Sequence, residues 1–274
     1  MTEHMLQDRV AIITGGSRGI GREVALTYAR EGCRIVLVAR DEKRLREAAT
    51  LIQKEAGTEA LCFGVDITEK ASLEAMVRAV TARFQRIDIL VNAAAIVGPI
   101  GPFETCDKTE WERTISVNVL GTYEAIRSVI PAMIARKRGT IINFAGGGAF
   151  GARERFSAYS VSKAAVVRLT DAAAAELRDH GITVNGISPG QVNTAGGISS
   201  TAMARWRSFT PAGPTGKRPS AWRCTARRDI CRSMDWGDSM DWSDSSTGNG
   251  LSGETLRQSN SGSSRQSPAS RTRR

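Results

Sequence analysis

A glycine-rich turn between an apolar run and a helical stripe is the feature that most limits how this chain can fold. The run Val10–Thr14 has the continuously apolar, β-branched character of a buried strand, and the turn Gly15–Gly21 follows it directly. Apolar residues then recur at helical spacing from Ile20 to Tyr28. A strand, a glycine turn and a helix in this order are the context of a dinucleotide-binding loop. There the helix N-terminus offers free N–H groups and a positive dipole end to a pyrophosphate.

The alternation continues along the chain, which at 274 residues and 41% hydrophobic content can build a sizeable core. Five further strands are expected, at Ile35–Val38, Ala60–Val65, Ile87–Val91, Gly139–Phe144 and Thr183–Ile187. The expected helices between them cover residues 41–56, 73–84, 109–136 and 159–180. Strands that alternate with helices predict an α/β fold with a doubly wound parallel sheet of the Rossmann type. We expect a single domain with an irregular C-terminal tail.

The pattern stops near residue 200. Only three residues after Pro211 are Ile, Leu, Val or Phe, and residues 201–274 carry +7 of the net charge of +10. Such a segment buries too little apolar surface to offset its ordering entropy. We therefore divide the chain into a Rossmann-type, nucleotide-binding catalytic domain (1–200) and a basic, Ser-rich tail (201–274) that is disordered or degenerate. A basic tail can contact nucleic acid, but a solvated end is the favoured interpretation, and nucleic acid is not an expected partner.

The cysteines and the hydropathy pattern bear on metal binding and on the cellular location of the protein. The five cysteines are odd in number and show neither C-x-x-C spacing nor a zinc pattern, so no metal site is expected. No apolar stretch approaches the 20 or so residues that span a bilayer, and we find no signal peptide. We expect a cytoplasmic protein with no membrane partner.

A second motif stands after the fifth expected strand, where Tyr159 and Lys163 form a Y-x-x-x-K. Spacing of i and i+4 places both side chains on one helix face, where an ammonium would lower the pKa of the phenol. With the T-G-x-x-x-G-x-G turn, this resembles the short-chain dehydrogenase/reductase family over about residues 6–195. Further landmarks occur in the family's order: Asp66 after the third strand, L-V-N-A-A-A at 90–95, N-V-L-G at 118–121 and N-G-I-S-P-G at 185–190.

The resemblance implies hydride transfer between NAD(P)(H) and a small-molecule carbonyl or alcohol. It implies Tyr159 as general acid/base, Lys163 as the residue that holds the nicotinamide ribose, and Asn118 as the anchor of a water in the proton relay. The cofactor contacts that it implies are Gly15, Ser17, Arg18, Gly19, Ile20, Gly21, Arg40, Asp66, Ile67, Asn92, Tyr159, Lys163, Pro189 and Gly190. It also implies a homo-oligomer through the helices that start near Thr109 and Tyr159.

The end of the second strand bears on the choice of nucleotide. Ala39 stands where NAD-preferring members of the family carry an acid, and Arg40 follows it. Together with Arg18 in the glycine turn, Arg40 could bind a 2′-phosphate. NADP is therefore the expected cofactor. NAD is the alternative, since Asp41 follows directly.

The chain departs from the family where a catalytic Ser is usual, about thirteen residues before the Tyr. Ala145 and Gly146 stand there, and neither has a hydroxyl. Loss of one such donor costs on the order of 10²–10³ in rate. Ser157 is the nearest substitute, but its position beside Tyr159 makes that role unexpected. The alternative to an active oxidoreductase is a catalytically impaired relative that binds the cofactor.

Overall fold

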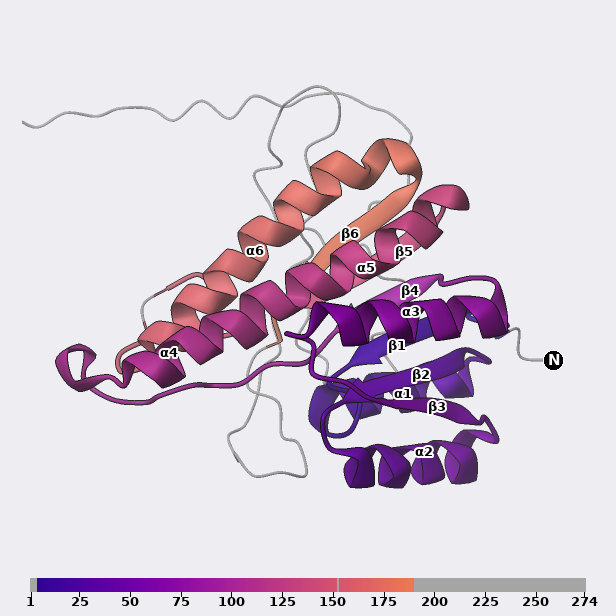
Figure 1. Ribbon diagram of the computed structural model, residues 1–274, viewed down its shortest axis with the longest axis horizontal. Helices are drawn as coiled ribbons and strands as arrows, with labels where there is room; N and C mark the ends of the chain where they lie inside the picture. Colours follow the sequence, from indigo (N-terminus) through magenta and orange to yellow (C-terminus); the bar gives the residue numbers. More distant parts are fainter. Residues whose placement is uncertain (1–3, 152, 190–274) are drawn as a thin grey trace, which may run out of the picture. The chain divides into compact units, whose positions relative to one another are not determined.

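Six parallel strands form one sheet in the order β3-β2-β1-β4-β5-β6 (Figure 1). The computed structural model describes residues 4–151 and 153–189. The strands are β1 (Val10–Thr14), β2 (Arg34–Ala39), β3 (Ala60–Gly64), β4 (Ile89–Asn92), β5 (Gly139–Phe144) and β6 (Ile182–Ile187). This is the Rossmann order, in which the strand sequence turns back between β1 and β4. The predicted doubly wound sheet is confirmed. The predicted tail, 201–274, lies outside the described residues.

Helices cover both faces of the sheet. One face packs against α1 (Gly19–Arg30) and α2 (Glu42–Ala56), and its core includes Ile13, Leu37 and Ile52. The other face packs against α3 (Lys70–Phe84), α5 (Gly121–Ala135) and α6 (Ser157–Leu177), and its core includes Ile12, Leu90 and Met133. Alternate residues of β1 therefore enter different cores, which explains why the whole strand is apolar.

The helix that was predicted from residue 109 to residue 136 is not continuous. It begins as α4 (Lys108–Ile115), passes through a π-helical turn η2 (Ser116–Leu120) and continues as α5. A π turn holds one extra residue, and such turns occur frequently at functional sites. Here the turn contains Asn118, whose buried side chain hydrogen-bonds outside its own helix. Apolar spacing alone does not reveal this insertion.

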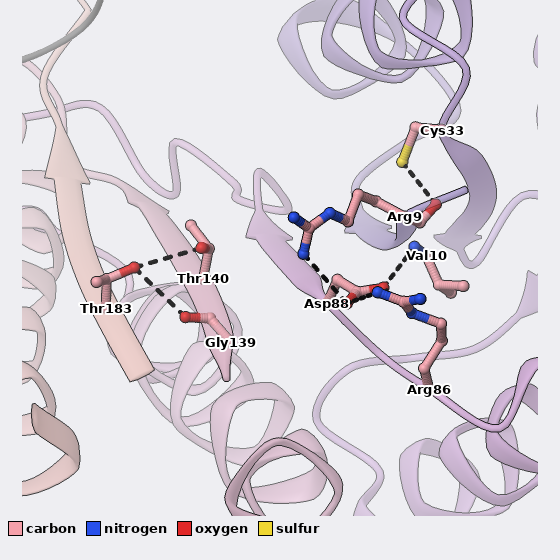
Figure 2. Close-up of polar contacts among 8 residues, drawn as sticks. All are labelled: Arg9, Val10, Cys33, Arg86, Asp88, Gly139, Thr140 and Thr183. Atoms are coloured by element: carbon pink, nitrogen blue, oxygen red, sulfur yellow. Dashed lines mark hydrogen bonds and ion pairs between the residues drawn. The ribbon is translucent and has the colours of Figure 1, made fainter. Parts of the chain in front are cut away.

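Asp88 joins three strands at the amino-end edge of the sheet (Figure 2). Its carboxylate is 2% exposed and accepts hydrogen bonds from the backbone N–H of Val10 (2.9 Å) and from the guanidinium of Arg86 (2.6 and 2.7 Å). Arg9 forms a longer ion pair with it, at 3.6 Å. The Asp88 backbone carbonyl accepts from Thr140 N–H at the start of β5. This cluster ties β1, β4 and β5 together at the edge opposite the glycine turn.

Candidate active site

The carboxyl ends of β1, β4 and β5 meet at one edge of the sheet, beside the point where the strand order turns back. Thr14, Asn92 and Phe144 are the last residues of these strands. Ligands of doubly wound sheets bind in the crevice at this point. The two motifs that the sequence singled out, the glycine turn and the Tyr159–Lys163 pair, follow β1 and β5 respectively, so the fold brings them to the same edge.

The turn after β1 admits only glycine at two of its positions. Gly15 has a φ of +69°, and a Cβ there would lie 2.7 Å from the backbone nitrogen of Ala94. A Cβ at Gly21 would collide with the carbonyl oxygen of Gly15. Gly19, with a φ of +57°, turns the chain into α1. The backbone is therefore bare where a ligand would approach helix α1.

No side chain of the described residues caps the N-terminus of α1. Arg18 is the N-cap residue in an extended conformation, its side chain makes no capping hydrogen bond, and no acidic residue stands in the first turn. The first N–H groups and the positive end of the helix dipole are thus free for an anion. Ser17 and Ile20 are half-buried and Arg18 is exposed. This arrangement fits the pyrophosphate of a dinucleotide.

At the end of β2, Arg40 is exposed and pairs with Asp66 at 3.7 Å. The neighbouring acid, Asp41, serves a different purpose. Its Oδ1 accepts the backbone N–H of Arg44 (3.0 Å) as the N-cap of α2, and Oδ2 pairs with the Arg44 guanidinium at 3.2 Å. The carboxylate that left NAD open as an alternative is therefore occupied by the helix cap.

Asp66 and Ile67 follow β3 at the same edge. Partial burial acts to raise the pKa of Asp66, but hydrogen bonds from the N–H and hydroxyl of Thr68, together with nearby arginines, hold it below its usual value. Asp66 is therefore ionised at neutral pH. Ile67 is buried, and a Cβ on Gly121 would lie 2.7 Å from its Cδ1. Ile67 thus packs against the start of α5.

A buried polar network links the three central strands to α6. Asn92 Nδ2 donates to Asn143 Oδ1 (2.9 Å), and Asn143 Nδ2 donates to Thr170 Oγ1 (3.0 Å). Thr14 Oγ1 contacts Asn92 Oδ1 at 3.4 Å. The side-chain amide of Asn92, which was predicted as a cofactor contact, therefore bonds to residues of the neighbouring strands. The sequence reasoning missed Asn143, although an Asn inside an apolar strand was a visible signal for a buried hydrogen bond.

Asn118 connects the loop after β4 to α6. Its Oδ1 accepts from Ile96 N–H (2.8 Å), and its Nδ2 donates to Ile96 O (2.8 Å) and Ser162 Oγ (2.9 Å). Ser162 Oγ in turn donates to the backbone carbonyl of Tyr159 (2.7 Å). The side chain of Asn118 thus joins the loop at Ile96 to Ser162, which in turn bonds the first turn of α6 at Tyr159.

Tyr159 and Lys163 lie on one face of α6, as their spacing predicted. Lys163 Nζ is 5.6 Å from the centroid of the Tyr159 ring and donates to the carbonyl oxygen of Phe144 (2.8 Å) at the end of β5. Lys163 is 4% exposed, and desolvation lowers its pKa to about 8. An ammonium with one backbone acceptor in a buried position retains donors for further partners such as ribose hydroxyls.

The predicted effect of Lys163 on the Tyr159 pKa was wrong for this structure. Burial raises the pKa of Tyr159, and the charge that opposes this rise belongs to Arg153. Lys163 is itself desolvated, which lowers its own pKa to about 8, and it donates to a backbone carbonyl. The Tyr159 hydroxyl is protonated at neutral pH.

Gly146 faces the Tyr159 hydroxyl at the position where the family's Ser is usual. A Cβ at Gly146 would lie 2.8 Å from Tyr159 Oη. Ala145, the other candidate for a missing hydroxyl, is buried against Val167. Position 146 is therefore the one beside the Tyr159 hydroxyl, and its lack of a side chain lets the phenol approach the backbone.

Two serines lie near Gly146 in sequence, and their contacts show whether either could supply the hydroxyl that Gly146 lacks. Ser157 Oγ accepts a hydrogen bond from Trp111 Nε1 (3.3 Å). Ser160 Oγ is buried without a hydrogen-bond partner in the described part of the chain, and it lies against Gly148, where a Cβ would collide with it. Neither hydroxyl contacts Tyr159 Oη in the part of the chain that the structure describes.

Pro189 and Gly190 are the remaining predicted contacts. Pro189 is half-buried just beyond β6, and Gly190 lies outside the described residues. Across residues 4–151 and 153–189, no group of three His, Cys, Asp or Glu side chains could hold a metal ion. No helix within these ranges is long and apolar enough to cross a membrane.

Comparison with known families agrees with this geometry. The model of the short chain dehydrogenase family matches residues 9–204. The chain belongs to the short-chain dehydrogenase family. This match confirms the family membership that the sequence motifs predicted.

Two short-chain dehydrogenase relatives illustrate the range of the family. An uncharacterized oxidoreductase of Staphylococcus saprophyticus is 41% identical over 189 residues, which are 69% of this chain and 80% of the relative. Galactitol 2-dehydrogenase of Agrobacterium fabrum is 36% identical over 208 residues, 75% of this chain and 79% of that protein. These relatives establish an oxidoreductase family and leave the substrate of this member open.

Solved structures of short-chain dehydrogenases superpose on most of the described residues. NAD⁺-bound xylitol dehydrogenase has a TM-score of 0.66 and 31% identity, and the match covers 68% of this chain and 71% of that one. A short chain dehydrogenase of Shigella flexneri in complex with NADP has a TM-score of 0.67 and 28% identity, covering 71% and 82%. One neighbour holds NAD⁺ and the other NADP, so membership alone does not select the nucleotide.

Proposed function

We propose that this short-chain dehydrogenase is an NADP(H)-dependent oxidoreductase that interconverts a carbonyl and an alcohol, with Tyr159 as general acid/base. The observation that carries the proposal is the position of Tyr159 Oη. It lies against the bare backbone of Gly146 at the carboxyl end of β5, with Lys163 buried on the same helix face. The glycine turn and the uncapped N-terminus of α1 stand at the same edge of the sheet and suit a dinucleotide.

The proton chemistry follows from the state of Tyr159. Because burial raises its pKa, the hydroxyl is protonated at neutral pH and can donate its proton to a carbonyl oxygen during reduction. Alcohol oxidation needs the phenolate as base, so its rate should rise with pH towards the raised pKa. The nicotinamide, when bound, supplies or accepts the hydride. Lys163 would hold the nicotinamide ribose, and Asn118 keeps the Tyr159 turn in place through Ser162.

The proposal is tested by mixing full-length protein and NADPH with a panel of aldehydes and ketones and following absorbance at 340 nm. Turnover of any member at neutral pH, with slower reduction above the Tyr159 pKa, supports it. A folded protein that turns over no member in either direction would contradict it. Circular dichroism on the same sample establishes that the protein is folded.

The preference for NADP rests on Arg40 and Arg18. Both guanidinium groups are exposed at the edge where the adenosine end of the cofactor would lie, and a 2′-phosphate is well matched by such planar donors. The position where NAD-preferring members of the family carry an acid holds Ala39, and the next acid along the chain, Asp41, caps α2.

Arg40→Ala should weaken NADPH binding by about 10- to 100-fold, the usual worth of a charge-assisted hydrogen bond, and change NADH binding little. Fluorescence titration with both nucleotides measures the ratio of the two dissociation constants. Arg46→Ala is the matched control, because Arg46 is an exposed arginine on α2 that pairs with Glu42. An unchanged ratio in Arg40→Ala would remove Arg40 from the account of nucleotide choice.

The absence of a side chain at Gly146 supports a second candidate function. In this alternative the protein is a catalytically impaired family member that binds the cofactor without efficient turnover. The family's substrate-oxygen donor has no counterpart at this position, and Ser157 is engaged with Trp111. Loss of such a donor costs on the order of 10²–10³ in rate. The two candidates differ in what a restored hydroxyl would do.

If the chain is an active enzyme adapted to Gly146, then Gly146→Ser should lower turnover about tenfold or more, because its Cβ would push Tyr159 Oη from its place. Gly146→Ala, which adds the Cβ without the hydroxyl, should have a similar effect. If the chain is impaired, Gly146→Ser should raise turnover above that of the unmodified chain and of Gly146→Ala. Steady-state kinetics of the three proteins decide between the candidates.

A homo-oligomer through α4, α5 and α6 is also part of the proposal. Exposed apolar side chains occur on these elements or the π turn between them, namely Leu120, Tyr123 and Val161. Helix α6 packs against α4 and the π turn, so these exposed side chains lie on adjoining elements. Covering such a surface with a second copy would remove it from water. Analytical ultracentrifugation of the full-length chain tests this part. The cytoplasmic location stays a prediction from the sequence.

A further inference from the structure

The turn before α6 holds an arginine in a defined position. Phe156 N–H donates to the carbonyl of Arg153 (3.2 Å), which closes a turn in which Arg155 has a φ of +65°. Gly101 N–H, from the loop after β4, donates to the carbonyl of Arg155 (3.1 Å). The turn is therefore closed by its own hydrogen bond and tied to a second loop of the site.

The Arg153 guanidinium lies over the ring of Phe156 and reaches the glycine run after β5. Its Cζ is 3.8 Å from the ring centroid, a cation–π distance. Its Nη1 would lie 3.7 Å from a Cβ at Gly147, the neighbour of the Gly146 that faces Tyr159. The cation is thus exposed beside the backbone that forms the wall of the site.

Arg153 has no carboxylate partner among the described residues. Fourteen ion pairs occur in this part of the chain, they engage most of its arginines, and none includes Arg153 or its neighbour Glu154. Its charge nevertheless reaches the catalytic phenol, because it opposes the rise that burial causes in the pKa of Tyr159. An ordered cation within electrostatic reach of the general acid, and without a protein anion, is suited to an anion on the substrate.

We propose that Arg153 is a specificity-determining residue that selects substrates carrying a carboxylate in addition to the reacting carbonyl or alcohol. The inference rests on the proposed oxidoreductase function and names its substrate class: oxo acids and hydroxy acids. The substrate carboxylate would meet the guanidinium at Gly147, while its carbonyl oxygen lies at Tyr159. Stacking on Phe156 limits the freedom of the arginine before substrate binds, which reduces the ordering cost.

The test uses full-length protein with NADPH and three matched pairs of substrates. These are 3-oxobutanoate, 4-oxopentanoate and 5-oxohexanoate, each with its methyl ester, so that the distance from ketone to carboxylate increases in steps. For at least one pair, kcat/KM should be about 10- to 100-fold higher for the acid than for the ester. Arg153→Met should bring this ratio close to one, mainly through KM of the acid. Arg153→Lys, which keeps the charge, should retain most of it.

Arg155→Met is the matched control, since it removes a charge from the same turn without touching the guanidinium on Phe156. Equal loss of the acid preference in Arg155→Met would show general attraction by a basic surface and overturn the proposal. So would esters that react as well as acids throughout, or a ratio that Arg153→Met leaves unchanged. A weakened NADPH affinity in Arg153→Met would overturn it as well, because the cation would then serve the cofactor.

Absence of any turnover would contradict the oxidoreductase function. In that case the affinity of the protein for the acids and esters tests the role of Arg153 independently of catalysis. Isothermal titration of the protein with the same acids and esters, in the presence of NADP⁺, gives that readout. Binding of an acid that is lost in Arg153→Met and kept in Arg155→Met supports the carboxylate site. Absence of binding by all three acids overturns it.

Discussion

Tyr159→Phe is expected to lower kcat for carbonyl reduction by about 10²–10⁴-fold, the usual contribution of a positioned general acid. Only the hydroxyl is removed. The ring keeps its place on α6 above Lys163, and the glycine turn and α1 are untouched. NADPH affinity should therefore change little. Stopped-flow or steady-state kinetics with a substrate of the native protein, together with fluorescence titration of NADPH, measure the two effects separately.

Tyr123→Phe is the matched control, because Tyr123 is an exposed phenol on α5 outside the site. It should keep full activity. If Tyr159→Phe retained more than about a tenth of kcat, a group other than Tyr159 would be the acid. If it also lost NADPH binding, the effect would lie in the structure of the site and not in the proton transfer.

Asp88→Ala should have the largest effect on stability, lowering the free energy of unfolding by about 3–5 kcal/mol. The change leaves Val10 N–H without its acceptor and removes the carboxylate that Arg86 and Arg9 share (Figure 2). Breaking a buried ion pair from one side is costly because the other groups stay without a partner. Urea unfolding at neutral pH measures the difference. NADPH affinity per folded molecule should be unchanged, since the cluster lies at the opposite edge of the sheet.

The same cluster predicts how the free energy of unfolding decreases at acidic pH. Burial acts to raise the pKa of Asp88, but hydrogen bonds from Arg86 and Val10 N–H and the charges of Arg86 and Arg9 hold it below the ordinary value of 3.8. The unfolded chain therefore takes up this proton first as pH falls. The contribution of Asp88 is fully present above the unfolded pKa and is lost as pH falls from there through the folded pKa. Asp88→Asn should lose this part of the pH dependence.

Asp171→Ala provides the stability control, because Asp171 pairs with Arg168 on the exposed side of α6. Such a surface pair contributes about 1 kcal/mol or less. If Asp88→Ala were no more destabilising than Asp171→Ala, the buried cluster would not hold the strands together as described.

The fold and the main motifs were predictable because they depend on local patterns. The glycine turn must follow a strand and precede a helix, and the packing of Gly15 on Ala94 and of Gly21 on the turn shows why glycine is needed there. Tyr159 and Lys163 share a helix face by spacing alone. The doubly wound parallel sheet follows from alternating strands and helices together with the handedness of their crossovers, whereas the order of its strands comes from the structure.

What the sequence could not provide depends on contacts between distant segments. The π turn at Asn118 exists where its amide joins Ile96 to Ser162, and no periodicity reports such a bond. The Tyr159 pKa was predicted in the wrong direction because burial, a property of the packed site, exceeds the effect of any neighbouring charge. Arg153 was not singled out, since its importance depends on a turn that places it over Phe156.

The nucleotide titration tests the central claim most directly. Full-length protein is titrated with NADPH and, separately, with NADH, and nicotinamide fluorescence is followed. The account predicts saturable binding of NADPH with a dissociation constant at least about tenfold lower than that of NADH, since Arg18 and Arg40 would both meet the 2′-phosphate. Folded protein that bound neither nucleotide would contradict the proposed function, and a preference for NADH would contradict the proposed role of the two arginines.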